Sequence, residues 1–286
     1  EDGKKDKVQE ENEWQFLGPL TKPQIRPYTD PSGMGRINCI AFHPRNPKNL
    51  WAGSAFGGVW HSTNGGGSWE TFPFTNFMSI GISDIAIANV SNTYTNIIYA
   101  ATGDADAAFG GINNFSIGII KSNDNGKNWK ITNFSSQISD RVLINRLIVD
   151  PRDTNHVYAA TTRGLFVTED GGDSWDTLTN AYTRDLEFKP GQPNTLWAAF
   201  LYGDGQNAYY GLFRVNIMQR EGKDSVTFNG TPVVFDYGPV VRMSVCVNMD
   251  NPDYVYVLSA SNGGCLHSVI YSPNCTDQWF YMSQTL

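Results

Sequence analysis

Two glycine-containing segments hold the residues whose types best suit ligand chemistry. Residues 103–116 read GDADAAFGGINNFS and residues 201–211 read LYGDGQNAYYG, so both combine aromatic rings with carboxylates and amides. Aromatic rings stack on the C–H faces of sugars, whose hydroxyls then need polar partners. The candidate ligand-binding residues in the two segments are Asp104, Asp106, Phe109, Phe115, Tyr202, Asp204, Tyr209 and Tyr210. The alternative is that the rings pack within their own loops and the acids cap turns.

The acids of these segments do not define a metal site or a hydrolase. Asp104 and Asp106 offer hard oxygen ligands for Ca²⁺, but two carboxylates are too few to complete a site. Glycoside hydrolysis needs two carboxylates at a set separation across one bond, and the sequence does not identify such a pair. The four histidines show no metal-ligand spacing. We therefore expect neither a metal nor a cofactor.

A turn pattern of the form Ser/Thr-x-Asp/Asn-x-Gly-x-x-Trp recurs along the chain and shows which elements carry the two segments. The Asp or Asn side chain accepts hydrogen bonds from backbone N–H groups, the Gly supplies a positive φ, and the Trp closes a hairpin by burying its ring. We expect these residues to be structural. They are Ser62, Asn64, Gly66 and Trp69; Ser122, Asp124, Gly126 and Trp129; Thr168, Asp170, Gly172 and Trp175; and, in a degenerate copy, Asn274 and Trp279.

A second set of anchors gives the length of the repeat. An aromatic residue follows an apolar one in LWAGS, IYAAT, VYAAT, LWAAF and VYVLS, at a mean spacing of about 51 residues. Each unit contains four short apolar runs that are separated by turn-forming residues. The pattern predicts an all-β propeller of four-stranded antiparallel blades, of which five are visible. The predicted units lie near 36–72, 81–134, 144–178, 184–228 and 241–282.

The order of the strands in such a blade predicts one loop face. The recurring turns lie at one end of the blades, and the loops between second and third strands lie at the other end. Both segments of interest are loops of this second kind. Phe56 and Arg163 occupy the same place in the first and third units and are further candidate ligand-binding residues.

The turn pattern and the repeat carry a resemblance to a known family. Residues 36–286 resemble the Asp-box (BNR) repeat propellers, which include sialidases, xyloglucanase-type hydrolases, the sortilin ectodomain and photosystem assembly factors. Residues 14–18 and the following GRINCIAFHPRNPKNLWAGSAFGGVWHSTNGGGSW are most similar to sortilin-like repeats of secreted Bacteroidetes-type proteins, many of them exported by the type IX route. The resemblance implies a secreted or outer-surface bacterial protein that binds a glycan, a peptide or a partner protein.

The resemblance also bears on catalysis. Xyloglucanase-type relatives carry a catalytic Asp in a segment that resembles WAGSAFGG, and Ala55 stands at that position here. The arginine-containing segment expected early in sialidases is absent. We therefore expect a binding module without catalysis. One alternative is a glycoside hydrolase that uses Asp104, Asp106 or Asp204, and another is an assembly or cargo component of a secretion complex.

Composition excludes further classes and divides the chain. The net charge is −7 and charged residues make up 17%, so no basic face is expected for nucleic acid. No apolar run reaches the roughly 18 residues of a membrane span. Residues 1–35 are predicted to be a charged, flexible lead-in followed by a proline-rich approach segment. We expect the propeller of residues 36–286 to be part of a larger one, with further domains of the same chain among its partners.

The four cysteines suggest one disulfide at most. Cys39 and Cys246 fall in equivalent first strands, where a small buried thiol is expected. Cys265 and Cys275 bracket the last predicted hairpin, and a disulfide between them would fit an oxidising compartment.

Overall fold

The chain divides into two units, Glu1–Arg36 and Ile37–Leu286, and every element described below belongs to the second unit. The structure is a computed structural model. It describes residues 36–72, 80–88, 96–105, 114–202, 209–220, 222–234, 240–261, 265–274 and 278–284.

Five sheets of four antiparallel strands make up the second unit. Blade one contains β1 (Ile37–His43), β2 (Asn46–Ser54), β3 (Val59–Ser62) and β4 (Glu70–Thr71). Blade two contains β5 (Ile82–Ala88), β6 (Ile97–Thr102), β7 (Gly118–Ser122) and β8 (Lys130–Ser135). Blade three contains β9 (Ile144–Val149), β10 (Val157–Thr161), β11 (Gly164–Thr168) and β12 (Asp176–Thr179). Blade four contains β13 (Thr183–Lys189), β14 (Gln192–Tyr202), β15 (Tyr209–Arg220) and β16 (Lys223–Val234). Blade five contains β17 (Val240–Val247), β18 (Val255–Ser261), β19 (Leu266–Ser272) and β20 (Phe280–Gln284).

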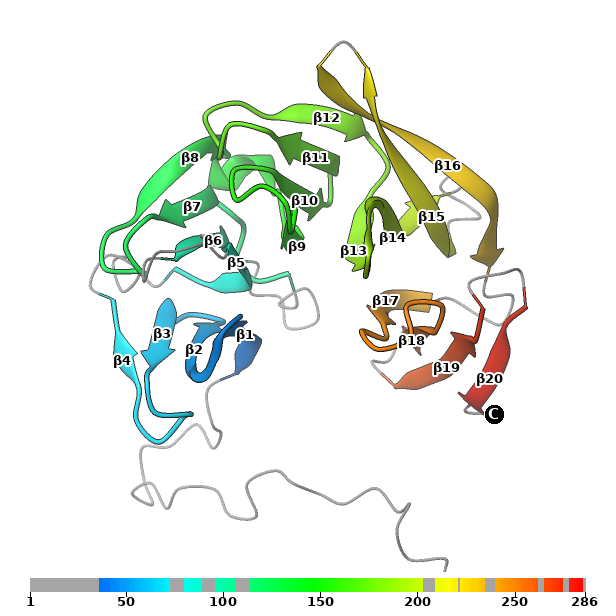
Figure 1. Ribbon diagram of the computed structural model, residues 1–286. Coiled ribbons are helices and arrows are strands. Elements are labelled where there is room, and N and C mark those ends of the chain that lie inside the picture. The colour runs from blue at the N-terminus through cyan, green and yellow to red at the C-terminus, as the bar shows by residue number, and fades with distance from the viewer. Residues whose placement is uncertain are drawn as a thin grey trace, which may run out of the picture. The chain divides into compact units, whose positions relative to one another are not determined.

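The five blades are arranged around an axis, with their first strands innermost and their fourth strands outermost (Figure 1). Neighbouring first strands contact one another in chain order, from β1 to β5, β9, β13 and β17. The predicted all-β propeller with five blades is therefore confirmed. In the described ranges the helical structure is one 3-10 turn, Ile138–Asp140. No helix in this part of the chain is long and apolar enough to cross a membrane.

A buried aromatic residue of one blade packs against the next blade. Trp51, Tyr99, Tyr158 and Trp197 hold the same place in the second strands of blades one to four, and all four are buried. Each shares an apolar cluster with the first strand of the following blade, as Trp51 does with Ile85. An aromatic ring of this kind buries about 150–250 Å², so these clusters join the blades.

Blades one and five each present one face that the described residues do not cover in this way. Equivalent first-strand residues that face the preceding blade are Ile85, Leu147, Leu186 and Val245, which are 6%, 2%, 0% and 6% exposed. Ile40 holds the same place in blade one and is 55% exposed. In blade five, Tyr256 is half-buried and stacks on Tyr254 and Tyr271 of its own blade.

The recurring turns make the same hydrogen bonds in blades one to three. The Asx oxygen accepts a hydrogen bond from the hydroxyl two residues before it and from the backbone N–H four residues after it. The Gly N–H donates to the same hydroxyl. The bonds from the hydroxyl to the Asx oxygen are Ser62 Oγ to Asn64 (2.9 Å), Ser122 Oγ to Asp124 (2.8 Å) and Thr168 Oγ1 to Asp170 (2.8 Å). The same hydrogen bonds therefore hold the turns of blades one to three.

The tryptophans of these turns pack against the preceding blade, which explains a difference in their burial. Trp129 contacts Phe72 and Trp175 contacts Phe134, at ring centroid distances of 6.4 and 5.2 Å. Trp69 was expected to be buried as well, but it is 38% exposed. Blade one has no earlier blade among the described residues to pack against.

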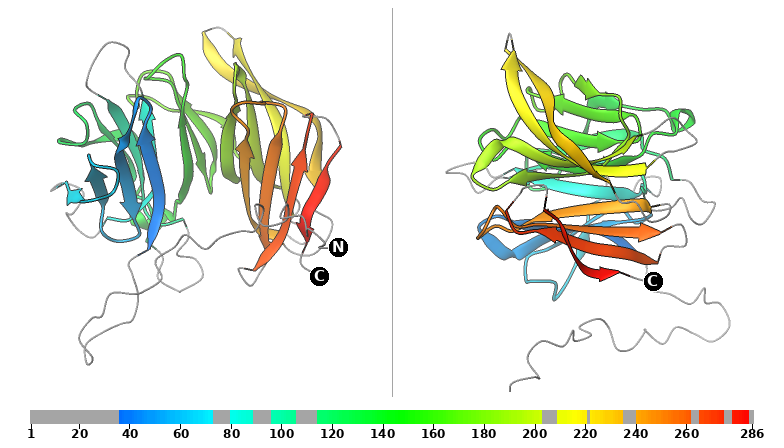
Figure 2. Two further views of the ribbon diagram at one scale, coloured as in Figure 1. Left: turned by 60° about the horizontal axis from the view of Figure 1, so that its bottom comes forward. Right: turned by 90° about the vertical axis from the view of Figure 1, so that its right-hand side faces the viewer.

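Two further expectations differ from the structure. Cys246 was expected to be a buried thiol but is exposed, because it lies on the uncovered face of blade five. The last two strands of blade four were expected to end near residue 228, but β15 and β16 are each 12 residues long. Without the Asx-centred turn the two strands continue pairing to Arg220 and Lys223, so a long hairpin forms (Figure 2).

Cys265 is exposed, and its proposed partner Cys275 lies outside the described residues.

The close packing of the turn glycines predicts a large cost for a side chain at Gly126. Its φ is 89°, and an added Cβ would lie 2.8 Å from Cζ of Phe72. We expect Gly126→Ala to lower the free energy of unfolding by about 2–4 kcal/mol, through backbone strain and overpacking. Gly191 is a matched control because its φ is 75° and nothing lies within 4 Å of an added Cβ. In urea unfolding, Gly191→Ala should lower the free energy of unfolding by about 1 kcal/mol, through backbone strain alone. Equal losses for the two variants would contradict the close packing of Gly126 against Phe72.

The uncovered face of blade one predicts unequal effects at equivalent positions. Ile85→Ala removes a buried side chain and should cost about 2–4 kcal/mol of unfolding free energy. Ile40→Ala should cost less than about 1 kcal/mol, because the side chain is 55% exposed. Chemical denaturation of the two variants checks this. A similar loss in both would mean that the face of blade one is covered in solution.

Candidate functional site

The first strands of neighbouring blades are joined at their beginnings by repeated side-chain hydrogen bonds. In each case a polar side chain at the second position donates to a backbone carbonyl of the next blade. The bonds run from Asn38 Nδ2 to Ile82 O (3.0 Å), from Ser83 Oγ to Ile144 O (2.6 Å) and from Asn145 Nδ2 to Thr183 O (2.7 Å). The first strands of blades one to four therefore begin at the same end of the propeller, where the loops between second and third strands also lie.

A register shift accompanies each of these bonds. In blades one to four the second residue of the first strand bulges out of the pairing with the second strand, and in blade five the shift precedes Arg242. A β-bulge turns the following side chain in a new direction. The residues that follow the shifts are Cys39, Asp84, Arg146, Asp185 and Arg242, and all of them line one cavity around the axis.

This axial cavity has a volume of about 370 Å³ and takes lining residues from the first strands of all five blades. Its charged side chains are three arginines, Arg146, Arg184 and Arg242, and two aspartates, Asp84 and Asp185. None of the described residues that line it is aromatic. The cavity is therefore polar and is lined by charges of both signs.

Arg146 lies among three acids. Its Nη1 is 3.8 Å from Asp84 Oδ1 and its Nε is 3.6 Å from Asp185 Oδ1, while Nη2 donates to Glu187 Oε2 at 3.1 Å. The aspartates also accept backbone hydrogen bonds from the following blades, Asp84 from Leu147 N–H (2.7 Å) and Asp185 from Val245 N–H (2.9 Å). The charge of Arg146 is thus compensated within the protein.

Burial changes the acidity of these groups. Burial raises the pKa of Asp84 to about 6, and the charge of Arg146 and the Leu147 N–H only partly oppose this rise. Burial raises the pKa of Asp185 and Glu187 for the same reason. Although burial acts against it, the charges of Asp84 and Asp185 raise the pKa of Arg146. Arg146 therefore stays charged at any working pH.

Arg184 and Arg242 supply the remaining positive charge of the cavity. Arg184 Nη1 donates to Asn145 Oδ1 at 2.9 Å, which fixes the guanidinium beside the neighbouring blade. A guanidinium has five N–H donors, and its planar fork matches a carboxylate or phosphate. The guanidinium groups of Arg146, Arg184 and Arg242 therefore give the cavity N–H donors of the kind that bind an anionic group.

The structure places some of the predicted ligand residues near this cavity. Asp104 is buried, and its Oδ1 accepts a hydrogen bond from Asn38 Nδ2 at 3.3 Å, while the next residue, Ala105, lines the cavity. Phe115 is half-buried and Phe56 is 48% exposed. Arg163 is exposed, and its Nη2 donates to the backbone oxygen of Asp140 at 3.1 Å.

The other predicted ligand residues either pair within blade four or lie outside the described residues. Tyr202 pairs with Tyr209, and Leu201 pairs with Tyr210, in the ladder between β14 and β15. Asp106, Phe109 and Asp204 lie outside the described residues. Ala55, at the position of a catalytic Asp in xyloglucanase-type proteins, is buried, and its carbonyl accepts a hydrogen bond from Asn114 Nδ2 at 3.0 Å.

Sequence reasoning missed the charged residues of the cavity. Asp84, Arg146 and Asp185 occur at the third position of ISDIAIA, INRLIV and TRDLEFK, inside strands that are otherwise apolar or half-apolar. A charge at the same place in three repeats was a usable signal. Its meaning depends on the bulge, which brings these positions to the axis.

Comparison with known proteins supports the fold. No protein-family model matches the sequence, and no curated protein matches it. Among solved structures, a crystal structure of an ancestral GH74 enzyme is similar with a TM-score of 0.59 and 18% identity, over 86% of this chain and 32% of that one. The chain thus spans about a third of the length of that enzyme. This likeness shows the propeller fold alone.

Two further structures are of YCF48. One, from Cyanidioschyzon merolae, has a TM-score of 0.42 and 14% identity over 86% of this chain and 85% of that one. The other is described as YCF48 bound to D1 peptide, with a TM-score of 0.45 and 11% identity over 86% of this chain and 81% of that one.

The buried carboxyl of Asp84 predicts a pH dependence of stability. Burial raises the pKa of Asp84 from its ordinary value of 3.8 to about 6 in the folded protein, so the folded state binds the proton more tightly. The stabilisation that Asp84 contributes to the folded state is greatest below about pH 4. As the pH rises through 6, the free energy of unfolding should fall by about 3 kcal/mol.

Urea unfolding between pH 4 and 7 checks this. Asp84→Asn should flatten the fall in stability relative to the wild type, since an amide cannot ionise. Asp250→Asn, which alters an exposed acid beyond the end of β17, should leave the slope unchanged. Parallel pH profiles for the wild type and Asp84→Asn would contradict the assignment.

Proposed function

We propose that this chain is a non-catalytic binding propeller that holds an acidic group of a peptide or protein ligand in its axial cavity. The observation that carries the proposal is the cavity of about 370 Å³ lined by three arginines and two aspartates from the first strands of the blades. Arg146 is compensated by acids of the protein. Arg184 and Arg242 add guanidinium N–H donors to the same lining, and we assign the acidic group of the ligand to them.

The size of the cavity supports a particular kind of ligand. Sites for small molecules typically measure about 300–1,000 Å³, so a volume of about 370 Å³ admits a side chain or a chain end. A larger partner would rest on the surrounding loops, where the exposed rings such as Phe56 lie. The ligand class that fits both features is a polypeptide with an exposed carboxylate.

The lining of the cavity argues against two alternatives. Sugar rings bind by stacking on aromatic side chains, and the described lining of the cavity has none. A glycoside hydrolase would need free carboxylates. Asp84 accepts from Leu147 N–H and has a side chain only 6% exposed, so it is committed to the fold. A glycan remains the alternative ligand for the loops, and hydrolysis the alternative function.

The uncovered faces support a larger assembly of blades. In blades two to five the face with Ile85, Leu147, Leu186 or Val245 is covered by the preceding blade, whereas Ile40 is exposed. We therefore include further blades of the same chain in the proposal. A secreted or outer-surface location, which rests on the family resemblance, completes it.

The proposed function predicts charge-selective peptide binding. A pool of fluorescent heptapeptides with one Asp or Glu should bind more tightly than the same pool with Asn or Gln, because only the acids pair with guanidinium groups. Arg242→Gln and Arg184→Gln should each weaken binding of the acidic pool by about tenfold or more. Fluorescence anisotropy measures both effects.

Arg163→Gln is the matched control, because Arg163 lies in a loop of the same face but does not line the cavity. It should leave the affinity unchanged. Equal binding of the acidic and neutral pools, or full binding by Arg242→Gln, would reject the axial cavity as the binding site.

A further inference from the structure

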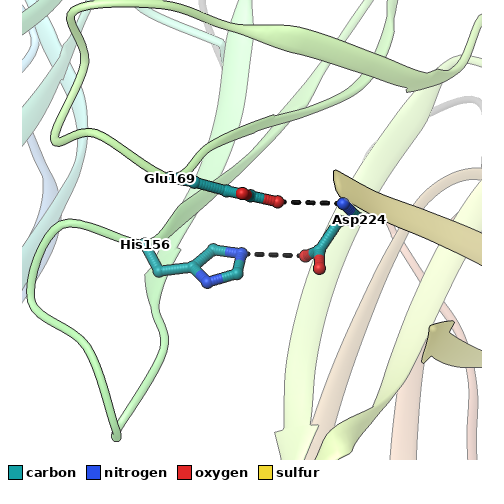
Figure 3. Close-up of side chains that lie close together, drawn as sticks. All are labelled: His156, Glu169 and Asp224. Atoms are coloured by element: carbon teal, nitrogen blue, oxygen red, sulfur yellow. Dashed lines mark hydrogen bonds and ion pairs between the residues drawn. The ribbon is translucent and has the colours of Figure 1, made fainter. Parts of the chain in front are cut away.

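Three side chains with metal-ligating atoms meet where blade three contacts the long hairpin of blade four. His156 immediately precedes β10, Glu169 follows β11, and Asp224 is the second residue of β16. One ligand atom from each residue lies within 4.8 Å of the others. Figure 3 shows the imidazole and both carboxylates pointing into the same space. The cluster lies at the end of the blades opposite the axial cavity.

Asp224 is the centre of the cluster. Its side chain is 0% exposed, and its Oδ2 lies 2.8 Å from Nε2 of His156. The hydroxyl of Tyr158 also donates to Oδ2, and the amide of Gln219 donates to Oδ1. Burying a carboxylate charge is costly unless a positive group faces it. Asp224 therefore needs a cation.

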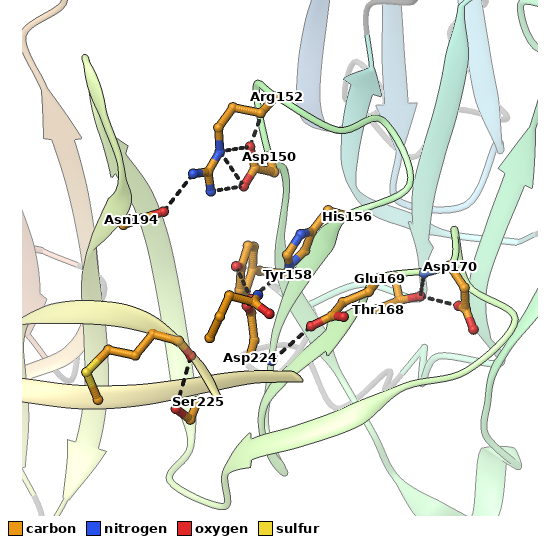
Figure 4. A network of polar contacts seen from close by, with 12 residues as sticks. Asp150, Arg152, His156, Tyr158, Thr168, Glu169, Asp170, Asn194, Asp224 and Ser225 are labelled. Atoms are coloured by element: carbon orange, nitrogen blue, oxygen red, sulfur yellow. Dashed lines mark hydrogen bonds and ion pairs between the residues drawn. The ribbon is translucent and has the colours of Figure 1, made fainter. Parts of the chain in front are cut away.

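His156 contacts Asp224 directly, whereas Arg152 acts on the Asp224 carboxylate from farther away. The neighbouring Arg152 is held by Asp150, at 2.6 Å, and by Asn194 (Figure 4). Glu169 adds a second acid, since its Oε1 accepts the backbone N–H of Asp224 at 2.9 Å. Imidazole is positive only when protonated. The cluster therefore brings one imidazole and two carboxylates together.

Space for an ion and its water is present beside the cluster. A cavity of about 270 Å³ is lined by His156 and Asp224 together with Asp150, Arg152 and Asp153. Glu169 is exposed, so an ion can reach the cluster from solvent and can keep a water ligand there.

We propose that Nε2 of His156 and the carboxylates of Glu169 and Asp224 bind one divalent cation of the zinc class. A set of one imidazole nitrogen and two carboxylates suits Zn²⁺, which binds nitrogen and oxygen and tolerates an open position. Ca²⁺ and Mg²⁺ prefer oxygen ligands, so they fit less well. Because an imidazole nitrogen binds a metal only when it is unprotonated, the ion takes the place of a proton on Nε2 of His156.

Binding at this place has a structural consequence. Two ligands come from blade three and the third from the hairpin of β15 and β16 in blade four. The ion would therefore fix the hairpin against blade three and stabilise the folded protein in proportion to its affinity. The site is independent of the axial cavity, so its test does not depend on the proposed function.

Titration calorimetry with ZnCl₂ on the EDTA-treated protein tests the proposal. The wild type should bind one Zn²⁺ per chain and show a raised melting temperature when saturated. Glu169→Gln should lower the affinity by about tenfold or more, because an amide is a poor ligand. Glu169 is exposed and Gln still accepts the Asp224 N–H, so this variant should fold and melt like the EDTA-treated wild type.

Asp173→Asn is the matched control, because Asp173 is an exposed acid of the same turn and is outside the cluster. It should retain wild-type affinity, whereas Asp224→Asn should lose binding as Glu169→Gln does. Absence of Zn²⁺ binding to the wild type would overturn the proposal. Equal affinities of the wild type and Glu169→Gln would also overturn it.

Discussion

The register shift near the start of each first strand is the constraint on which the axial site depends. Regular pairing would send alternate side chains of these strands into the contacts between blades. The bulge frees one polar residue to bond the next blade, as Asn38 and Ser83 do, and places the following residue at the axis. The same irregularity joins each of blades one to three to the next blade, and in blades two to five a charged residue that lines the cavity follows it.

The charges at the axis have two separate roles. Asp84 and Asp185 hold neighbouring blades through backbone N–H groups, and they compensate Arg146 between them. These three residues stabilise the centre of the propeller and are poorly placed to act on a ligand. Arg184 and Arg242 line the same cavity, and in the proposed function they bind the ligand. The distinction explains how a polar cavity can exist at the centre of a fold that is otherwise joined by aromatic and aliphatic packing.

Sequence alone predicted the fold well because local patterns specify it. The aromatic anchors such as Tyr99 and the turns around Asp124 and Asp170 have fixed spacing and a physical reason at each position. The axial site was not predicted, because a bulge depends on pairing between strands and has no clear sequence signature. The cluster of His156, Glu169 and Asp224 was also missed, since its residues come from three separate segments. The exposure of Ile40 follows from which blades are present, which no local pattern encodes.

Hydrogen–deuterium exchange with and without an acidic peptide ligand tests the central claim most directly. If the ligand's carboxylate occupies the axial cavity, exchange should slow at the beginnings of the first strands, at residues 37–41, 83–85, 145–147, 184–186 and 242–244. These segments are distant in sequence, and all of them contribute residues to the lining of the cavity. Protection confined to the loops at 103–116 and 201–211, with no change in the first strands, would contradict the account.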